Sequence, residues 1–292
     1  MNSKTKIAIA SGKGGTGKTF ISTNLFNVLQ KRDFNVAIVD CDAEEPNVRE
    51  FLYGDLKHSH EVTQKVPVIA ESECTYCGKC KEYCNYNAIF FLKDTKMIKV
   101  LDELCHGCGA CSVACEYEAI SEKDDVLGQI NRYAISTNCT LIEARMNVGV
   151  YSPVNVIKYA IKEANGFDLI LLDSPPGTSC PFIQTVATAD YVVLVTEPTP
   201  FGLSDLMQSV DTLKSMGKSC GVIINRADLG NKDIYDYLQL ENIPLLMTVP
   251  FDKKIAVSYS NGELLTNLYP DWDLQFNQLY HTITEQYGNS NN

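Results

Sequence analysis

The sequence predicts a doubly wound α/β fold with a mostly parallel sheet, interrupted by a small inserted α+β domain. A strand, a glycine-rich loop and a helix open the chain, and apolar strands alternate with helices again after about residue 150. A cysteine-rich segment lies between these two parts. We expect the α/β domain at residues 1–70 and 125–292 and the inserted domain at residues 71–124, because surface loops tolerate insertions.

The elements of the α/β domain follow one another as strand, loop and helix. Strands are expected at 7–10 and 35–39 around a helix at 20–30, which is the start of a parallel βαβ pattern. The later expected elements are a helix at 152–165, strands at 167–172 and 190–196, a helix at 203–216, a strand at 219–225, a helix at 232–241 and a strand at 244–249. The cysteine-rich segment holds only short β-like pieces.

The composition limits the functions that are open to the chain. Its 292 residues are 45% hydrophobic, enough for a buried core in about two domains, and the formal net charge is −11. The acidic balance argues against binding to nucleic acid, and no apolar run approaches the ~20 residues of a membrane helix. Without an export signal we expect a cytoplasmic protein. Its 12 cysteines are then metal ligands, redox groups or buried thiols rather than disulfides.

The glycine-rich loop fits the pattern G-x-x-x-x-G-K-[ST], which predicts a site for ATP. Its glycines let consecutive backbone N–H groups turn towards phosphate oxygens. Lys18 would contact the β- and γ-phosphates, and the Thr19 hydroxyl would hold Mg²⁺. The remaining expected nucleotide contacts of the loop are Gly12, Gly14, Gly15, Thr16 and Gly17.

A second lysine, Lys13, makes the loop resemble the deviant P-loop of the superfamily of MinD, ParA, Mrp and the nitrogenase iron protein. The resemblance implies slow ATP hydrolysis by a homodimer that forms on ATP binding. It also implies that Lys13 reaches the nucleotide of the other subunit. The alternative is a solvated loop lysine.

Three further segments support this resemblance. Asp42, at the end of the second strand, resembles the residue that orients the attacking water, with Asp40 as a support residue near Mg²⁺; a plain strand cap is the alternative. Asp173 ends an apolar strand and resembles the Walker B ligand of Mg²⁺, while Gly177 resembles the switch II glycine that senses the γ-phosphate.

The same resemblance implies that a third set of residues binds the base of the nucleotide. Asn225 ends a late strand and matches the asparagine that reads adenine, although an asparagine there is often only a turn former. Pro250 and Phe251 follow the next strand and resemble the loop that flanks the base.

Eight cysteines occur in two runs with the spacing of two-cluster bacterial ferredoxins. In that arrangement three cysteines of one run and the fourth of the other hold each [4Fe–4S] cluster. The first set is Cys74, Cys77, Cys80 and Cys115, and the second is Cys105, Cys108, Cys111 and Cys84. Structural zinc is the alternative, with a poorer match of spacing. Asn85 and Glu116 stand where a proline usually follows the fourth cysteine.

The other four cysteines carry less information. Cys41, Cys139 and Cys220 are interpreted as buried or incidental thiols. Cys180 lies seven residues after Asp173, an interval at which the nitrogenase iron protein has a cysteine that bridges a cluster across its dimer. A second matching cysteine is lacking, so a plain buried thiol remains the alternative.

The whole chain therefore resembles MinD-superfamily ATPases with an inserted ferredoxin domain, and three functions stay open. The first is ATP-gated electron transfer through two [4Fe–4S] clusters to or from an unidentified protein with a basic docking face. The second is an ATPase that assembles or inserts metal or iron–sulfur cofactors. A positioning or partition ATPase is third, because the tail from residue 271 has no lysine or arginine with which to bind a membrane.

Overall fold

The computed structural model describes residues 4–290, which divide into two compact units. The first unit comprises the residues up to His60, Ile130–Arg145 and the chain from Val154 onwards. The second comprises Glu61–Gln129 and Met146–Pro153. Two long strands, β3 (Asp55–Ile69) and β6 (Ile120–Ala134), contribute residues to both units. The second unit thus extends beyond the expected insertion at 71–124 on both sides.

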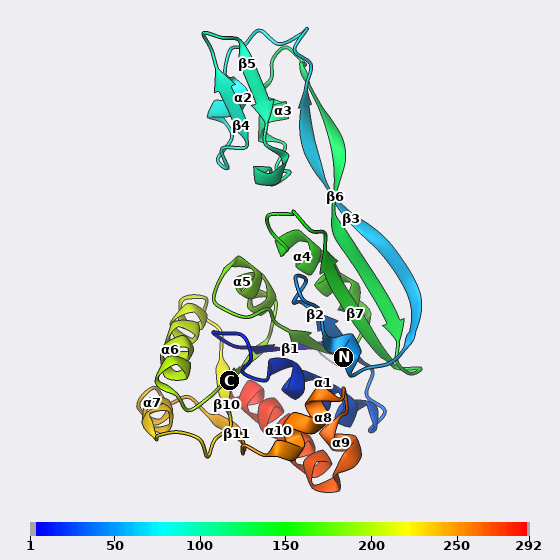
Figure 1. Cartoon of the computed structure of the whole chain (residues 1–292), viewed down its shortest axis with the longest axis vertical. Helices are drawn as coiled ribbons and strands as arrows, with labels where there is room; N and C mark the ends of the chain where they lie inside the picture. Colours follow the sequence, from blue (N-terminus) through cyan, green and yellow to red (C-terminus); the bar gives the residue numbers. More distant parts are fainter. Residues whose placement is uncertain (1–3, 291–292) are drawn as a thin grey trace. The chain divides into compact units, whose positions relative to one another are not determined.

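The first unit is built on a sheet in the order β11-β10-β9-β1-β8-β2-β7-β6-β3 (Figure 1). Neighbouring strands from β11 to β7 pair in parallel. The expected strands are β1 (Thr5–Ala10), β2 (Val36–Asp40), β8 (Leu169–Asp173), β9 (Tyr191–Thr196), β10 (Cys220–Asn225) and β11 (Leu245–Val249). Their central members are apolar and buried along their length, as a sheet covered on both faces requires.

Helices cover both faces of this sheet (Figure 1). Helix α1 (Lys18–Gln30) packs against β1, β2 and β8 and against α9 (Leu265–Leu268) and α10 (Pro270–Ser290). The other described helices of this unit are α4 (Val154–Glu163), α5 (Cys180–Ala187), α6 (Pro200–Ser215), α7 (Asp233–Leu240) and α8 (Lys253–Ser260), with short turns η1 (Val48–Glu50) and η3 (Ala164–Gly166). Strands β1 and β8 lie between these two layers of helices. Because they run parallel, their carboxyl ends lie at the same edge of the sheet.

Three strands were not expected from the sequence: β3, β6 and β7 (Cys139–Met146). Strands β6 and β7 are neighbours joined by four residues, so they run antiparallel. Most of β3 is exposed and polar, so it shows no continuous alternation of apolar residues. Directly after the end of β3 and before the start of β6, the Ala70 N–H donates to the Ala119 carbonyl at 2.8 Å.

The second unit has its own small core around the cysteines. Strands β4 (Ile89–Leu92) and β5 (Met97–Val100) form an antiparallel hairpin. Ile89 and Ile98 on its inner side are buried and pack in one cluster with Cys80 and Cys111. The remaining elements are α2 (Lys79–Glu82), α3 (Ala110–Ala114) and η2 (Asp102–Leu104).

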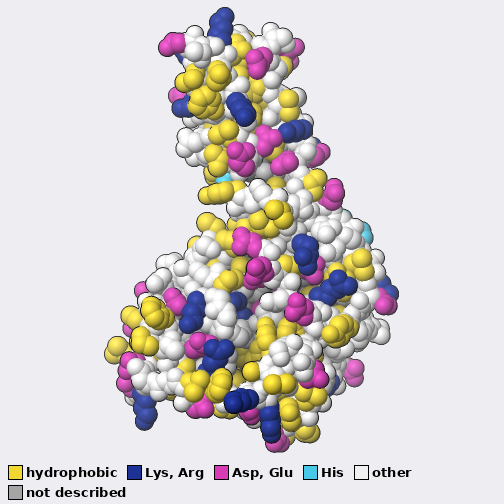
Figure 2. Space-filling model, viewed as in Figure 1, with side chains coloured by type: hydrophobic (Ala, Val, Ile, Leu, Met, Phe, Trp, Pro, Cys, Tyr) yellow, Lys and Arg dark blue, Asp and Glu magenta, His cyan; other side chains and the backbone are white. Residues whose placement is uncertain are grey.

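The surface mixes charges of both signs. On the face drawn in Figure 2, lysine and arginine side chains lie among aspartates and glutamates, and no continuous basic stripe is visible there. Within residues 4–290 no helix is both long enough and apolar enough to cross a bilayer. The face in view thus offers no broad electrostatic surface for a polyanion.

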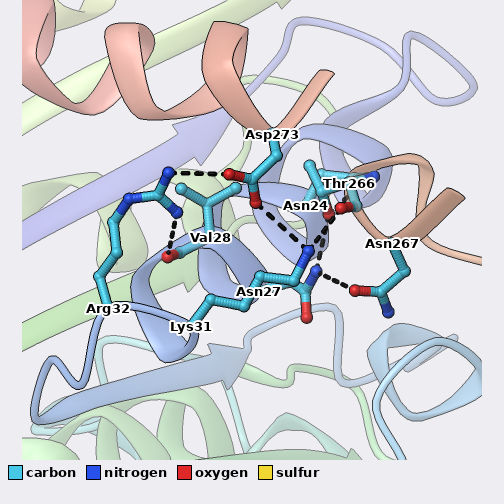
Figure 3. A network of polar contacts seen from close by, with 8 residues as sticks. All are labelled: Asn24, Asn27, Val28, Lys31, Arg32, Thr266, Asn267 and Asp273. Atoms are coloured by element: carbon cyan, nitrogen blue, oxygen red, sulfur yellow. Dashed lines mark hydrogen bonds and ion pairs between the residues drawn. The ribbon is translucent and has the colours of Figure 1, made fainter. Parts of the chain in front are cut away.

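The C-terminal helices are fixed to α1 by a polar network (Figure 3). The Asn27 side chain donates to the Thr266 hydroxyl and to the side-chain Oδ1 of Asn267, both at 2.8 Å. The Arg32 guanidinium donates to the Asp273 carboxylate at 2.8 Å, and this bond lowers the pKa of Asp273. Phe276, Leu279 and Ile283 of α10 are buried, so this helix packs against the core through these residues, whereas Leu274 is exposed.

Candidate functional site

The glycine-rich loop lies between β1 and α1, and its backbone requires glycine at two places. Gly15 and Gly17 have φ angles of 76° and 100°. A Cβ on Gly17 would also lie 2.6 Å from the Asn225 side-chain nitrogen. Helix α1 starts at Lys18 and no side chain caps its N-terminus, so its first N–H groups are available to an anion. The local geometry is that of a phosphate-binding loop.

The expected Mg²⁺ residues meet at the carboxyl edge of the sheet. Asp40 on β2 is in register with Asp173 on β8, and both are buried. The Thr19 hydroxyl donates to Asp173 Oδ2 at 2.8 Å, and Asp173 Oδ1 is buried without a hydrogen-bond partner. Burial raises the pKa of Asp173, although Thr19 and Lys18 oppose the shift. A hydroxyl and an orphaned carboxylate oxygen are oxygen ligands of the kind that Mg²⁺ prefers, so these residues fit the ion.

Lys18 and Asp42 lie near enough to influence each other electrostatically. Burial lowers the pKa of Lys18, while the Asp173 and Asp42 carboxylates raise it. Burial likewise raises the pKa of Asp42, and Lys18 opposes that shift. Gly177 has a φ of 87°, and its N–H donates to the Ser11 carbonyl at 3.1 Å, on the loop side of the site.

Asp40 organises the chain that follows β2. Its Oδ1 accepts from the Asp42 N–H at 3.2 Å, and its Oδ2 accepts from the N–H groups of Asn47 and Val48 at 2.9 and 3.0 Å. Burial and the Asp173 carboxylate raise the pKa of Asp40 well above its usual value. The observed hydrogen bonds of Asp40 therefore hold the loop at 42–48, and its expected role beside Mg²⁺ stays a prediction.

A hollow of about 740 Å³ adjoins the loop and is lined by the three residues expected to bind the base of the nucleotide. Asn225, Pro250 and Phe251 line it together with Gly15 and Gly17. The Asn225 side chain donates to the Thr16 carbonyl at 2.8 Å and accepts from the Arg226 N–H at 2.9 Å. One N–H of its amide then remains for a ligand. The sequence did not point to the other lining side chains, which are Phe20, Arg226, Asp252, Ile255, Ala256 and Tyr259.

Lys13 forms an ion pair within its own chain. Its Nζ lies 3.5 Å from Oε2 of Glu197, whose Oε1 lies 2.7 Å from the Arg226 guanidinium. Glu197 is buried and follows the end of β9, at the same edge of the sheet as the other site residues. Sequence reasoning missed Glu197, although an acidic residue directly after a buried parallel strand was a usable signal.

The eight cysteines of the second unit line two separate hollows. The first, of about 350 Å³, is lined by Cys74, Cys77, Cys80 and Cys115. The second, of about 380 Å³, is lined by Cys84, Cys105, Cys108 and Cys111. The fourth cysteine of each run therefore lies with the first three cysteines of the other run, which is the grouping that the spacing predicts. Their role as cluster ligands stays a prediction.

The chemistry of the hollows fits thiolates that are bound to iron. Backbone N–H groups of Tyr76, Ala88 and Gly107 donate to the sulfurs of Cys74, Cys84 and Cys105 at 3.3–3.4 Å. Such bonds tune iron–sulfur clusters. Within residues 4–290 no three His, Cys, Asp or Glu side chains converge on the position of a single ion. A cubane is held at its corners, so its four thiols need not converge in this way.

The remaining cysteines differ in exposure. Cys41 and Cys139 are buried and Cys220 is partly buried. Cys180, the first residue of α5, is exposed, so its interpretation as a buried thiol is wrong. The chain turns there after the strand β8, and the thiol faces solvent rather than the core.

A glycine-rich loop between the first strand and helix of a parallel sheet, with carboxylates at neighbouring strand ends, defines a P-loop ATPase. The chain belongs to the family described as the CobQ/CobB/MinD/ParA nucleotide binding domain (CbiA), which it matches over residues 7–265. It is therefore an ATPase of the MinD/ParA type.

Its relatives carry varied names. It is 33% identical over 263 residues to an uncharacterised protein of Methanocaldococcus jannaschii, covering 89% of this chain and 92% of that one. It is 25% identical over 277 residues to an iron–sulfur cluster carrier protein of Rickettsia conorii, covering 91% and 67%. The crystal structure of the cell division ATPase MinD from Pyrococcus furiosus matches with a TM-score of 0.59 at 22% identity, covering 97% and 99%, which shows a shared fold.

Proposed function

We propose that this ATPase gates electron transfer through two [4Fe–4S] clusters held by the second unit. The observation that carries the proposal is the division of eight cysteines into two hollows of four, with N–H groups donated to sulfur. Each cluster would supply one-electron redox chemistry. Strands β3 and β6 run from the second unit, which holds the cysteines, into the first unit, which holds the ATPase site.

Hydrolysis in the proposed mechanism depends on charge and on the position of one water. Lys18 is held near Asp42 and Asp173, where its ammonium group stabilises the phosphate charge that grows in the transition state. Thr19 and Asp173 would hold Mg²⁺, which would supply further charge stabilisation. Asp42 orients the attacking water. The Asn225 amide and the loop around Phe251 bind the base.

The proposed active form is a homodimer that assembles on ATP binding. Lys13 would leave Glu197 and contact the nucleotide of the second subunit. The pair with Glu197 is 3.5 Å long and the Lys13 side chain is 31% exposed, so its release costs little. Glu197 would keep its partner Arg226 after Lys13 leaves.

Substitution Lys13→Ala is expected to retain nucleotide binding and to abolish ATP-dependent dimerisation, with at least a ~100-fold loss of kcat. Light scattering with Mg²⁺ and a non-hydrolysable ATP analogue measures the dimer. Lys158→Ala, at an exposed position of α4, is the control and should dimerise normally. A dimer of normal stability in Lys13→Ala would remove Lys13 from the proposed mechanism.

The gating proposal is tested on the anaerobically purified protein with both clusters present. We expect ATP to shift at least one midpoint potential by about 60 mV or more, which is tenfold in the equilibrium constant for one electron. Redox titration followed by EPR, with and without Mg-ATP, measures the shift, and stopped-flow reduction of an electron acceptor measures the rate. Equal potentials and equal rates in both states would contradict gating.

A second candidate function is the assembly of iron–sulfur cofactors, favoured by the similarity to the carrier protein of Rickettsia conorii. Four cysteines per hollow favour retention of a cluster over its release. Rapid, ATP-dependent transfer of iron and sulfide to an apo-ferredoxin acceptor would favour assembly over electron transfer. For either function, the net charge of −11 favours a protein partner with a basic docking face over a nucleic acid.

A further inference from the structure

The turn formed by residues 47–51, here called the junction turn, is held by contacts from three directions. The Asp40 carboxylate accepts from the backbone N–H groups of Asn47 and Val48. The ring of Phe51 packs on the ring of Tyr259 with centroids 4.7 Å apart. The guanidinium of Arg49 lies over the ring of Tyr133, 4.6 Å from its centroid. The junction turn therefore touches β2, α8 and β6.

Two of these contacts come from residues at the nucleotide site. Asp40 is in register with Asp173, the expected Mg²⁺ ligand, at the phosphate end of the site. Tyr259 lines the hollow expected to hold the base. The junction turn therefore contacts residues from both ends of the expected nucleotide site.

The third contact leads to the strands that carry the cysteines. Tyr133 belongs to β6, and β6 continues into the second unit. Two residues earlier, Asn131 accepts from the Ser59 hydroxyl of β3 at 2.7 Å and donates to Glu143 of β7 at 3.1 Å. Asn131 and Glu143 are buried. These bonds join β3, β6 and β7 into one rigid group beside the junction turn.

Nucleotide binding has a direct structural route to this turn. Asp40 is in register with Asp173 on the neighbouring strand β8, and both carboxylates are buried at the carboxyl edge of the sheet. A nucleotide bound at this edge would act on the position of the Asp40 carboxylate. Because Asp40 holds the N–H groups of Asn47 and Val48, a shift of its carboxylate acts on the turn directly.

We propose that the junction turn transmits occupancy of the nucleotide site to β6, with Arg49 as the positioning residue that couples the turn to Tyr133. The proposal deepens the proposed gating and rests on its premise that nucleotide binding alters the cysteine unit. It requires no electron transfer, however, because the predicted change is a change in the backbone of β6. The effect on β6 is therefore measured separately from the redox properties of the protein.

Amide hydrogen exchange of the full chain, with and without Mg²⁺ and a non-hydrolysable ATP analogue, tests the proposal. In the wild type we expect the analogue to change exchange at residues 120–129 of β6 by about threefold or more. In Arg49→Ala this nucleotide-dependent change should disappear. Affinity for the analogue should stay within about twofold, because Arg49 does not line the base hollow.

The chain offers a matched control one residue away from Tyr133. The guanidinium of Arg132, also on β6, lies 5.5 Å from the ring centroid of Phe167, outside the junction turn. Arg132→Ala removes a contact of the same type from the same strand and should keep the nucleotide-dependent change. Tyr133→Phe retains the ring under Arg49 and should also keep it, whereas Tyr133→Leu should lose it.

Two results would overturn the proposal. One is a wild-type β6 whose exchange does not respond to the analogue. The other is an Arg49→Ala variant that responds as fully as the wild type. Failure of the gating proposal has a different signature, which is unchanged midpoint potentials and electron-transfer rates in a protein whose β6 does respond.

Discussion

Substitution Asp42→Asn is expected to lower kcat for ATP hydrolysis by at least ~100-fold and to leave KM within a few-fold of the wild-type value. Asp42 lies two residues after the end of β2 and interacts electrostatically with Lys18, and its carboxylate is proposed to accept a hydrogen bond from the attacking water. An asparagine keeps the shape and removes the charge. Steady-state hydrolysis with Mg-ATP, together with analogue binding, separates the two parameters.

The pH dependence gives the same experiment a second readout. Burial raises the pKa of Asp42, so the active carboxylate is lost on acidification at a higher pH than for an ordinary aspartate. Wild-type kcat should therefore fall as the pH drops through that raised pKa, and Asp42→Asn should lack this acid limb. Glu44→Gln, at an exposed position two residues on, is the control and should keep kcat and an acid limb, displaced to lower pH because the Glu44 carboxylate helps to raise the pKa of Asp42. A normal kcat in Asp42→Asn would exclude Asp42 from the orientation of the water.

Substitution Cys115→Ser is expected to remove one of two clusters, so iron falls from about eight to about four atoms per chain. Cys115 is the fourth cysteine of the second run, but it lines the hollow of Cys74, Cys77 and Cys80. Cys84→Ser should remove the other cluster for the reciprocal reason. Iron and sulfide analysis of anaerobically purified protein gives the count, and EPR identifies the cluster that remains.

The grouping of ligands gives this experiment its specificity. Cys115→Ser and Cys77→Ser should leave the same EPR spectrum, and Cys84→Ser and Cys108→Ser should share a different one. Cys139→Ser, at a buried cysteine of the first unit, is the control and should keep all the iron. Matching spectra for Cys115→Ser and Cys108→Ser would refute the grouping. Zinc in place of iron in the wild type would refute the clusters themselves.

The parts that the sequence predicted well are those in which local chemistry and local structure agree. The apolar strands β1, β2 and β8 could be located from their composition because both faces of the sheet are covered there. The meeting of Thr19, Asp40 and Asp173 followed from the shared edge of parallel strands. The placement of Asn225 beside Phe251 followed from the resemblance to a known family.

The parts that were missed depend on contacts distant in sequence. The β3 segment is largely polar, and its identity as a strand depends on pairing with β6, about 65 residues later. Glu197 matters because the folded chain brings it near Lys13 and Arg226. Tyr259 likewise joins the site only through the packing of α8. No local sequence pattern indicates these contacts, so neither secondary-structure propensity nor sequence motifs could locate them.

The hydrogen bond from Ala70 to Ala119 has a consequence for which changes of the chain the fold can accept. The segment between these residues holds all eight clustered cysteines, yet its two ends are paired neighbours at 2.8 Å. Because the entropy cost of closing a loop grows only slowly with loop length, a long segment with adjoining ends costs the strands that carry it little more than a short one. A short reverse turn could connect the end of β3 to the start of β6 equally well. Removing or replacing the whole cysteine-bearing piece between these two residues is therefore compatible with an intact β3–β6 pair and an intact ATPase sheet.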